Sequence, residues 1–181
     1  LFSNKNVVMT SSNHISGTDR VYEAVSKIGL KDDDVIINLQ GDEPFINPKD
    51  INNLFDLAVK EEVKMATLYS ELKSTSELKN LNIVKILIDN GTATDFFRKT
   101  STKENVFIHQ GIYAFKYKTL QSFVNWDPSA NEKKYKLEQL RALDNGITIN
   151  AIKSISKIHL GVDTEDDLKK ANEIAKKNSH K

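Results

Sequence analysis

The features that this sequence lacks exclude several classes of function. None of its 181 residues is cysteine, which rules out disulfides, thiolate catalysis and zinc sites built on cysteine. No apolar run approaches the roughly 18 residues that a membrane-spanning helix needs. The charge is almost balanced, with 26 Lys and Arg against 25 Asp and Glu, so no basic surface suited to nucleic acid is expected. We therefore expect neither a nucleic-acid partner nor a membrane partner.

The remaining composition is typical of one globular domain. Hydrophobic residues make up 39% of the chain and charged residues 28%, and 181 residues are enough to bury a core. Only 7 glycines and 3 prolines occur, and no repeat or low-complexity linker divides the sequence. The absence of cysteine also fits a reducing compartment. We predict a single domain over residues 1–181.

Strand and helix patterns alternate in the first part of the chain. Three apolar runs predict strands: 7–10, 35–39 and 65–69. Between the first two, Thr18 or Asp19 can cap a helix with an apolar face. Before the third, Asn47 and Pro48 are typical of an N-cap and a first helical residue, and this second helix runs on through Ala58. Strands alternating with helices predict parallel strands joined by crossovers.

The middle of the chain follows a different pattern. Asn90-Gly91 is a strong signal for a hairpin between strands at 83–89 and 93–98, and a long strand at 106–117 follows it. The remaining expected elements are helices at 120–126 and 136–144, a strand at 147–152 and a last helix capped by Thr164 and Asp167.

These elements together predict an α/β fold. We expect a mixed, mainly parallel sheet with helices on both faces, and an antiparallel insertion at residues 83–117.

Two acidic residues follow predicted strands or loops where ligands commonly bind. Asp42, in the segment Gln40-Gly41-Asp42-Glu43-Pro44, comes directly after the strand 35–39, and Asp163 lies near the other end of the chain. Acids at strand ends are where α/β proteins place their chemistry, and a carboxylate pair can hold Mg²⁺ against substrate phosphates. Each has a plainer alternative, because Asp42 can be a loop or capping residue and Asp163 can cap the last helix.

Other candidates also have structural alternatives. The segment Ser16-Gly17-Thr18-Asp19-Arg20 suits a phosphate or base edge at a helix start, or is an ordinary capped helix. His109 and Tyr113 lie on one strand and are either catalytic or structural. Lys85 lies among apolar residues, so it needs an anionic partner if it is buried, or else it faces solvent. Glu138 and Arg141, three residues apart on a helix, predict a local ion pair.

The order of these motifs resembles one enzyme family, the CMP-KDO synthetases (3-deoxy-manno-octulosonate cytidylyltransferases). The resemblance covers nearly the whole chain. Seven segments carry it: Ser16-Gly17-Thr18-Asp19-Arg20, Gln40-Gly41-Asp42-Glu43-Pro44, Met65-Ala66-Thr67, Val84-Lys85, His109-x-Gly111-Ile112-Tyr113, Leu137-Glu138-Gln139-Leu140-Arg141 and Gly161-Val162-Asp163-Thr164.

The resemblance implies a Rossmann-like nucleotidyltransferase fold and a specific reaction. CTP and the acid sugar KDO (3-deoxy-D-manno-octulosonate) would give CMP-KDO and pyrophosphate, for lipopolysaccharide biosynthesis. It further implies a Mg²⁺ cofactor, a cytoplasmic homodimer and a dimer-forming or sugar-side role for residues 83–117. Asp42 and Asp163 would be the catalytic metal ligands. The nucleotide would meet Ser16, Gly17, Thr18, Arg20 and Gln40. The sugar acid would meet Gln40, Lys85, Arg98, His109, Tyr113, Glu138 and Gln139.

The sequence also departs from the family pattern. The family's first strand and basic, glycine-containing phosphate loop are not recognisable here, so we expect about 60 residues in two strand–helix units to be missing. The loop after Arg98 is short, and Gln110 replaces an apolar residue, both on the sugar side.

These departures leave alternatives open. The enzyme could act on another acid sugar, such as a sialic acid or 8-amino-KDO, or the chain could be a non-catalytic homologue. A metal-dependent glycosyltransferase is disfavoured, because Glu43-Pro44 follows Asp42 where Asp-x-Asp is usual.

Overall fold

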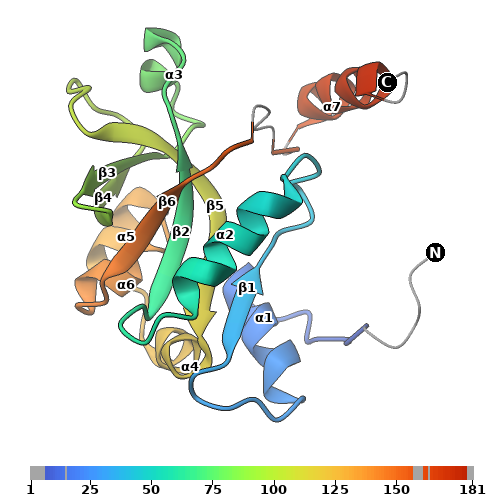
Figure 1. Ribbon diagram of the computed structural model, residues 1–181, viewed down its shortest axis with the longest axis vertical. Coiled ribbons are helices and arrows are strands. Elements are labelled where there is room, and N and C mark those ends of the chain that lie inside the picture. The colour runs from blue at the N-terminus through green and yellow to red at the C-terminus, as the bar shows by residue number, and fades with distance from the viewer. Residues whose placement is uncertain (1–6, 15, 157–160, 163, 179–181) are drawn as a thin grey trace.

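A computed structural model describes residues 7–14, 16–156, 161–162 and 164–178, and Figure 1 shows a central sheet covered by helices. The helices are α1 (Gly17–Ser26), α2 (Pro48–Ala58), α3 (Thr75–Lys79), α4 (Tyr117–Asn125), α5 (Ala130–Tyr135), α6 (Leu140–Asp144) and α7 (Glu165–Asn178). The strands are β1 (Val35–Asn38), β2 (Met65–Ser70), β3 (Lys85–Asp89), β4 (Thr92–Phe97), β5 (Val106–Lys116) and β6 (Ile149–Lys153).

The described strands form one six-stranded mixed sheet in the order β1-β5-β2-β6-β4-β3. The prediction of a mixed α/β fold is confirmed, but the direct pairings are mostly antiparallel. The long strand β5 enters between β1 and β2 and runs antiparallel to both. Among the described strands, β2 and β6 make the single parallel pairing. β1 and β2 still point the same way, as a strand–helix–strand unit requires.

Strand β5 also brings the predicted insertion back onto the sheet. Its first residues pair with β3, and β4 pairs with β6, so β5, β2, β6, β4 and β3 close into a ring. The hairpin between β3 and β4 turns at Asn90 and Gly91, which both have positive φ as the predicted two-residue turn requires. A bulge interrupts β5 against β2, because Thr67 lies opposite Tyr113 whereas Leu68 lies opposite Gln110.

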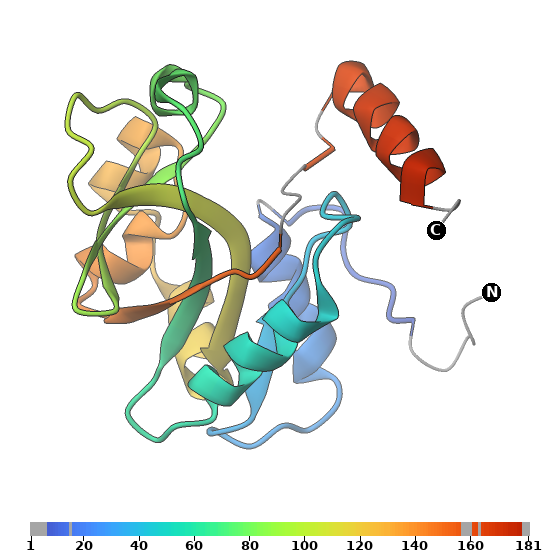
Figure 2. The same ribbon diagram turned by 45° about the horizontal axis from the view of Figure 1, so that its top comes forward.

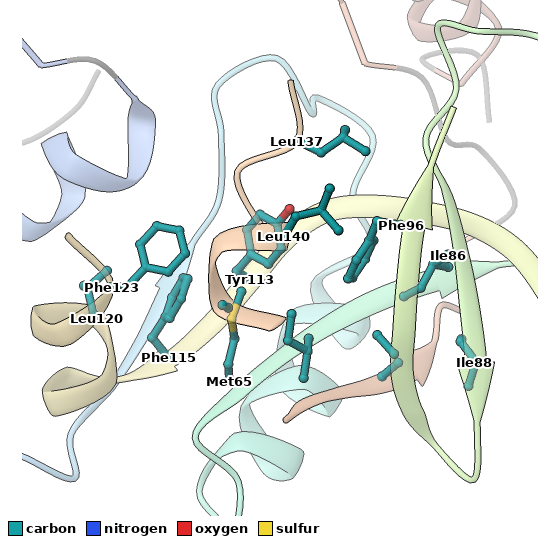
Figure 3. Packing of buried hydrophobic residues seen from close by; sticks show 14 of the residues in the cluster. Met65, Ile86, Ile88, Phe96, Tyr113, Phe115, Leu120, Phe123, Leu137 and Leu140 are labelled. Atoms are coloured by element: carbon teal, nitrogen blue, oxygen red, sulfur yellow. The ribbon is translucent and has the colours of Figure 1, made fainter. Parts of the chain in front are cut away.

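Helices pack on both faces of the sheet, as predicted. On one face, Leu54 and Ala58 of α2 are buried against Ala66 and Ile112. The larger core lies on the other face, where α4 and α6 cover the sheet (Figure 3). Helix α7 stands away from the sheet in both ribbon views (Figures 1 and 2), although Ala171 is buried. None of the helices in the described part of the chain combines the length and the apolar character that a membrane span requires.

Two predicted elements differ in the structure. Residues 7–10 form no strand; they pair with no strand in the described part of the chain, and Met9 is 84% exposed. Of the helix predicted at 136–144, only the last part forms, as α6, and residues 136–139 are not helical. A separate helix, α5, precedes the predicted range and ends at Lys136, which is in the left-handed conformation. Ser129 caps α5 and forms a capping box with Glu132, so a short helix forms before the leucines on which the prediction rested.

Local details of the predicted helices also change. The cap of α1 is Ser16, not Thr18 or Asp19, and Asp19 completes its capping box. The cap of α2 at Asn47 is confirmed. Phe55 directly follows the fully buried Leu54 but is itself 45% exposed, because the buried side of α2 is narrow.

Candidate active site

One cavity of about 950 Å³ collects residues from motifs that are far apart in the sequence. It contains most of the predicted site residues: Ser16, Gly17, Gln40, Asp42, Arg98, His109, Tyr113, Glu138 and Gln139. Gly161 and Thr164, which flank the second predicted acid, line the same cavity. Thr18, Arg20 and Lys85 do not line it, and Asp163 lies outside the described residues.

Asp42 is half-buried in the turn that follows β1, at the edge of this cavity. Its carbonyl oxygen accepts a hydrogen bond of 2.9 Å from the backbone N–H of Val162. This contact holds the segment next to Asp163 against Asp42. Thr164 caps α7, since its hydroxyl accepts from the N–H of Asp167 at 3.2 Å, so this helix does not need Asp163 as its cap.

The donors at this edge fit Mg²⁺, a hard cation that binds oxygen and keeps several waters. Asp42 supplies a carboxylate facing the cavity. Within the described residues, no group of three or more His, Cys, Asp or Glu surrounds a single point. A site of this kind therefore relies on one or two carboxylates and on oxygens from the substrate, as is usual for Mg²⁺ at phosphates.

Glu138 is held by a polar chain that crosses from β1 to the loop before α6. The Thr18 hydroxyl, fully buried, donates to Oε1 of Glu138 at 2.6 Å and accepts from Asn38 Nδ2 at 3.2 Å. The other carboxylate oxygen, Oε2, is buried and has no hydrogen-bond partner among the described residues. Burial raises the pKa of Glu138, against the opposing effects of the Thr18 and Ser16 hydroxyls. Thr18 therefore orients Glu138 from below the cavity surface.

His109 and Tyr113 are both buried in the cavity wall, with ring centroids 5.4 Å apart. Nε2 of His109 lies 3.0 Å from the Thr67 hydroxyl. Burial lowers the pKa of His109 to about 3, so the imidazole is neutral near pH 7. Burial and the nearby Glu138 raise the pKa of Tyr113 well above 10.0, so the phenol keeps its proton. Both side chains thus act as neutral hydrogen-bonding groups.

Lys85 is fully buried, so it does not face solvent, and the expectation of an anionic partner is also wrong. Its ammonium donates to three backbone carbonyls: those of Ile83 and Arg98, each at 2.9 Å, and that of Asn80. Burial and the charge of Arg98 lower the pKa of Lys85. Asn80, Ile83 and Arg98 line the cavity, so Lys85 braces the wall from behind.

The two arginines at the site differ in position. Arg98 lines the cavity, and its Nη1 donates to the carbonyl of Leu81 at 3.1 Å. Arg20 instead points to the preceding loop, donating to the Thr10 hydroxyl at 2.7 Å and to the carbonyl of Ser11 at 3.0 Å.

The predicted ion pair between Glu138 and Arg141 does not form. Arg141 is buried and binds Glu132 through two nitrogens, with Nε–Oε2 at 2.7 Å and Nη2–Oε1 at 2.5 Å. The break at Lys136 turns α5 back, which places Glu132 beside the guanidinium. Glu138 then faces the cavity, while the Glu132–Arg141 pair fastens α5 to α6 beneath it.

The cavity also contains residues that the sequence patterns did not single out. They include Ser70, Lys73, Glu77, Asn82, Lys136 and Lys170. Two of them had a local signal: Lys136 directly precedes the Leu137–Arg141 motif, and Lys170 lies one helical turn after Asp167. The departure noted at Gln110 has a structural counterpart, since its amide donates to the Ser70 hydroxyl at 2.9 Å beside the cavity.

Comparison with known proteins gives consistent matches. The family model described as cytidylyltransferase matches residues 2–155. The 3-deoxy-manno-octulosonate cytidylyltransferase of Alcanivorax borkumensis is 38% identical, over 91% of this chain and 72% of its own length. The Coxiella burnetii protein of the same name is 39% identical, over 91% of this chain and 72% of its own length.

Solved structures agree with these matches. CMP:2-keto-3-deoxy-manno-octonic acid synthetase complexed with CTP superposes with a TM-score of 0.85 at 32% identity, over 94% of this chain and 72% of that one. The 2-C-methyl-D-erythritol 4-phosphate cytidylyltransferase of Francisella tularensis has a TM-score of 0.63 at 16% identity, over 95% of this chain and 74% of that one, and shows the fold alone.

Proposed function

Because the chain belongs to the cytidylyltransferase family, we propose that it transfers the CMP group of CTP to 3-deoxy-D-manno-octulosonate and releases pyrophosphate. One observation carries the proposal: residues from separate motifs, including Asp42, Arg98, His109 and Glu138, line a single cavity. Relatives named for this reaction share 38% and 39% of the aligned residues, and the solved relative was complexed with CTP.

In the proposed reaction, the anomeric hydroxyl oxygen of the sugar bonds to the α-phosphorus of CTP. The bond from that phosphorus to the pyrophosphate oxygen breaks, and the hydroxyl proton passes to solvent. Mg²⁺, held by Asp42 and by Asp163, would neutralise charge on the phosphates. The segment next to Asp163 is fastened to Asp42 by the Val162 hydrogen bond, which supports a shared role for the two acids.

The chain's own side chains would bind and orient the two substrates. Ser16, Gly17 and Gln40 lie together at the start of α1 and the end of β1, where backbone N–H groups favour a nucleotide. Arg98 can fork onto the sugar carboxylate, because a planar guanidinium matches two carboxylate oxygens. Glu138 Oε2, buried and without a partner among the described residues, would accept from a sugar hydroxyl.

Pyrophosphate release from CTP and KDO with Mg²⁺ tests this proposal directly. Asp42→Asn should lower turnover by about 100-fold or more, because one ligand oxygen and its charge are lost. Asp56→Asn is the matched control: Asp56 is exposed on α2 and does not line the cavity, so its activity should be unchanged.

The same assay, repeated with a sialic acid and with 8-amino-KDO in place of KDO, separates the alternatives. Release with a sialic acid or 8-amino-KDO, but not with KDO, would replace the proposed sugar while keeping the reaction. No release with any acid sugar, together with no binding of CTP, would favour a non-catalytic homologue.

We infer from the same resemblance that the protein is a cytoplasmic homodimer that acts ahead of lipopolysaccharide assembly. Residues 83–117 would contribute to the dimer, and the hairpin tip at Asn90 and Gly91 is exposed and so accessible to a partner. Light scattering coupled to size exclusion tests the dimer, and a purely monomeric mass at assay concentrations would contradict it.

A further inference from the structure

The bulge in β5 places one hydroxyl, that of Thr67, at the centre of a buried hydrogen-bond cluster. Thr67 is fully buried on β2. Its Oγ1 lies 2.8 Å from the carbonyl oxygen of Ile112, 3.2 Å from that of Gln110 and 3.0 Å from Nε2 of His109. Because Gly111 and Ile112 bulge out of register with β2, the hydroxyl fills the position where the regular backbone ladder is interrupted.

The proton count at this cluster determines the tautomer of His109. A hydroxyl has one proton, and both carbonyl oxygens can only accept. Thr67 therefore donates to one of the carbonyls and turns a lone pair toward His109. An unprotonated Nε2 would then place two lone pairs face to face at 3.0 Å. Nε2 must carry the proton, and since the imidazole is neutral, Nδ1 has a free lone pair.

This free lone pair belongs to a side chain that lines the active-site cavity. His109 is part of the cavity wall, and its Nδ1 has no hydrogen-bond partner among the described residues. The ring cannot turn freely, because it packs edge-on against Phe96, with centroids 4.9 Å apart, and beside Tyr113. Glu138 Oε2 is a second acceptor in the same wall without a partner among the described residues. Two fixed acceptors suit a ligand that brings O–H donors.

We propose that Thr67 is a positioning residue that holds His109 in the Nε2–H tautomer, so that Nδ1 accepts a hydrogen bond from a hydroxyl of the acid sugar. The inference rests on the proposed function for the identity of the ligand, but the tautomer itself does not depend on it.

The tautomer is read by two-bond ¹H–¹⁵N correlation spectra of protein labelled at histidine nitrogens, at pH 7. The chain has 4 histidines, so the His109 signals are assigned by their loss in His109→Gln. The wild type and Thr67→Ser should show the Nε2–H pattern, because both keep the hydroxyl. Thr67→Val, of nearly equal shape, should lose it and populate the Nδ1–H form. A Nδ1–H pattern in the wild type would overturn the proposal whether or not any variant folds.

Steady-state kinetics provide the second readout. Thr67→Val should raise KM for the acid sugar by about tenfold, the equivalent of one hydrogen bond, with KM for CTP unchanged. Thr67→Ser should restore the wild-type value. An equal rise in both KM values, or no rescue by serine, would show that Thr67 only supports the fold. If no acid sugar is turned over, the proposed function fails, while the spectra still decide the tautomer.

Discussion

Replacing Asp50 should show how much one buried carboxylate contributes to the free energy of unfolding. Asp50 binds the segment that leads from β6 toward the active site. Asp50 lies in the first turn of α2 and is 0% exposed. Its carboxylate accepts from the Ser154 hydroxyl at 2.7 Å, from the N–H groups of Ile155 at 2.7 Å and Ser156 at 3.1 Å, and from the Ser156 hydroxyl. These bonds hold the segment that leaves β6 in the direction of Gly161.

Asp50→Asn keeps the shape but changes one oxygen into an NH₂ group. The bond from Ile155 N–H to Oδ1 can persist, and the two serine hydroxyls can rotate to accept. The N–H of Ser156 cannot, because it would face another donor. The variant loses that bond, and its remaining hydrogen bonds no longer involve a charged acceptor. The free energy of unfolding should therefore fall by about 2 to 4 kcal/mol, since a bond to a charged group contributes roughly 1.5–3 kcal/mol and a neutral one about 1 kcal/mol. Because the variant no longer buries a charge, it avoids a desolvation cost, and this offsets part of the loss of stability.

At acid pH, wild type and Asp50→Asn should have nearly the same free energy of unfolding. Burial acts to raise the pKa of Asp50, but the bonds from Ser156, Ile155 and Ser154 outweigh it and leave the pKa below 3.8. A lowered pKa means that the carboxylate stabilises the fold fully above the unfolded value of 3.8, and that this contribution is lost as pH falls through the lower folded value. The asparagine side chain of the variant does not titrate, so the difference in the free energy of unfolding should close on acidification.

The assay is urea unfolding of wild type and Asp50→Asn at pH 7 and at several values below pH 4. Asp56→Asn, an exposed acid on the same helix, is the control and should change the free energy of unfolding by less than about 0.5 kcal/mol. An Asp50→Asn effect as small as the control, or a difference that persists in acid, would refute this account of the carboxylate.

Three further substitutions test other parts of the structure by urea unfolding. Lys85→Met should lower the free energy of unfolding by about 2 to 4 kcal/mol, because three carbonyls lose a charged donor; the exposed Lys64→Met is its control, and equal effects would contradict the bracing role. Glu138→Gln should gain stability relative to wild type as pH rises from 4 to 7, because the raised pKa of Glu138 means that its ionised form is disfavoured in the folded protein. A relative stability that falls as pH rises would contradict a raised pKa. Gly91→Ala should cost about 1 to 2 kcal/mol, since φ is +78° there, and a change below about 0.5 kcal/mol would argue against a strained turn.

Sequence patterns predicted best where a structural requirement is satisfied within a few residues. The hairpin turn at Asn90 and Gly91 and the helix cap at Asn47 were both recognisable, because each depends on the conformations that its own residues allow. The missed break at Lys136 has a different origin. The leucine spacing there is helical, but Glu132 pairs with Arg141 across the break, and that contact requires the chain to turn.

The candidate site shows the same division. Residue types and their order indicated which side chains belong to it, and nine of those named, Ser16, Gly17, Gln40, Asp42, Arg98, His109, Tyr113, Glu138 and Gln139, line one cavity. The sequence could not assign roles within it. Lys85 was expected to meet an anion or solvent, and instead binds carbonyls that come together only when β3 packs against its neighbouring loops.

The sequence by itself therefore determined most of the strands and helices, the hairpin turn, the cap at Asn47 and many of the polar groups that line the cavity. The tertiary structure decided the order of strands, with β5 between β1 and β2, and decided which polar groups meet. The hydrogen bond from Thr18 to Glu138 joins residues 120 positions apart. No local periodicity encodes such a contact, because it arises only when burial of the apolar faces brings distant segments to the same side of the sheet.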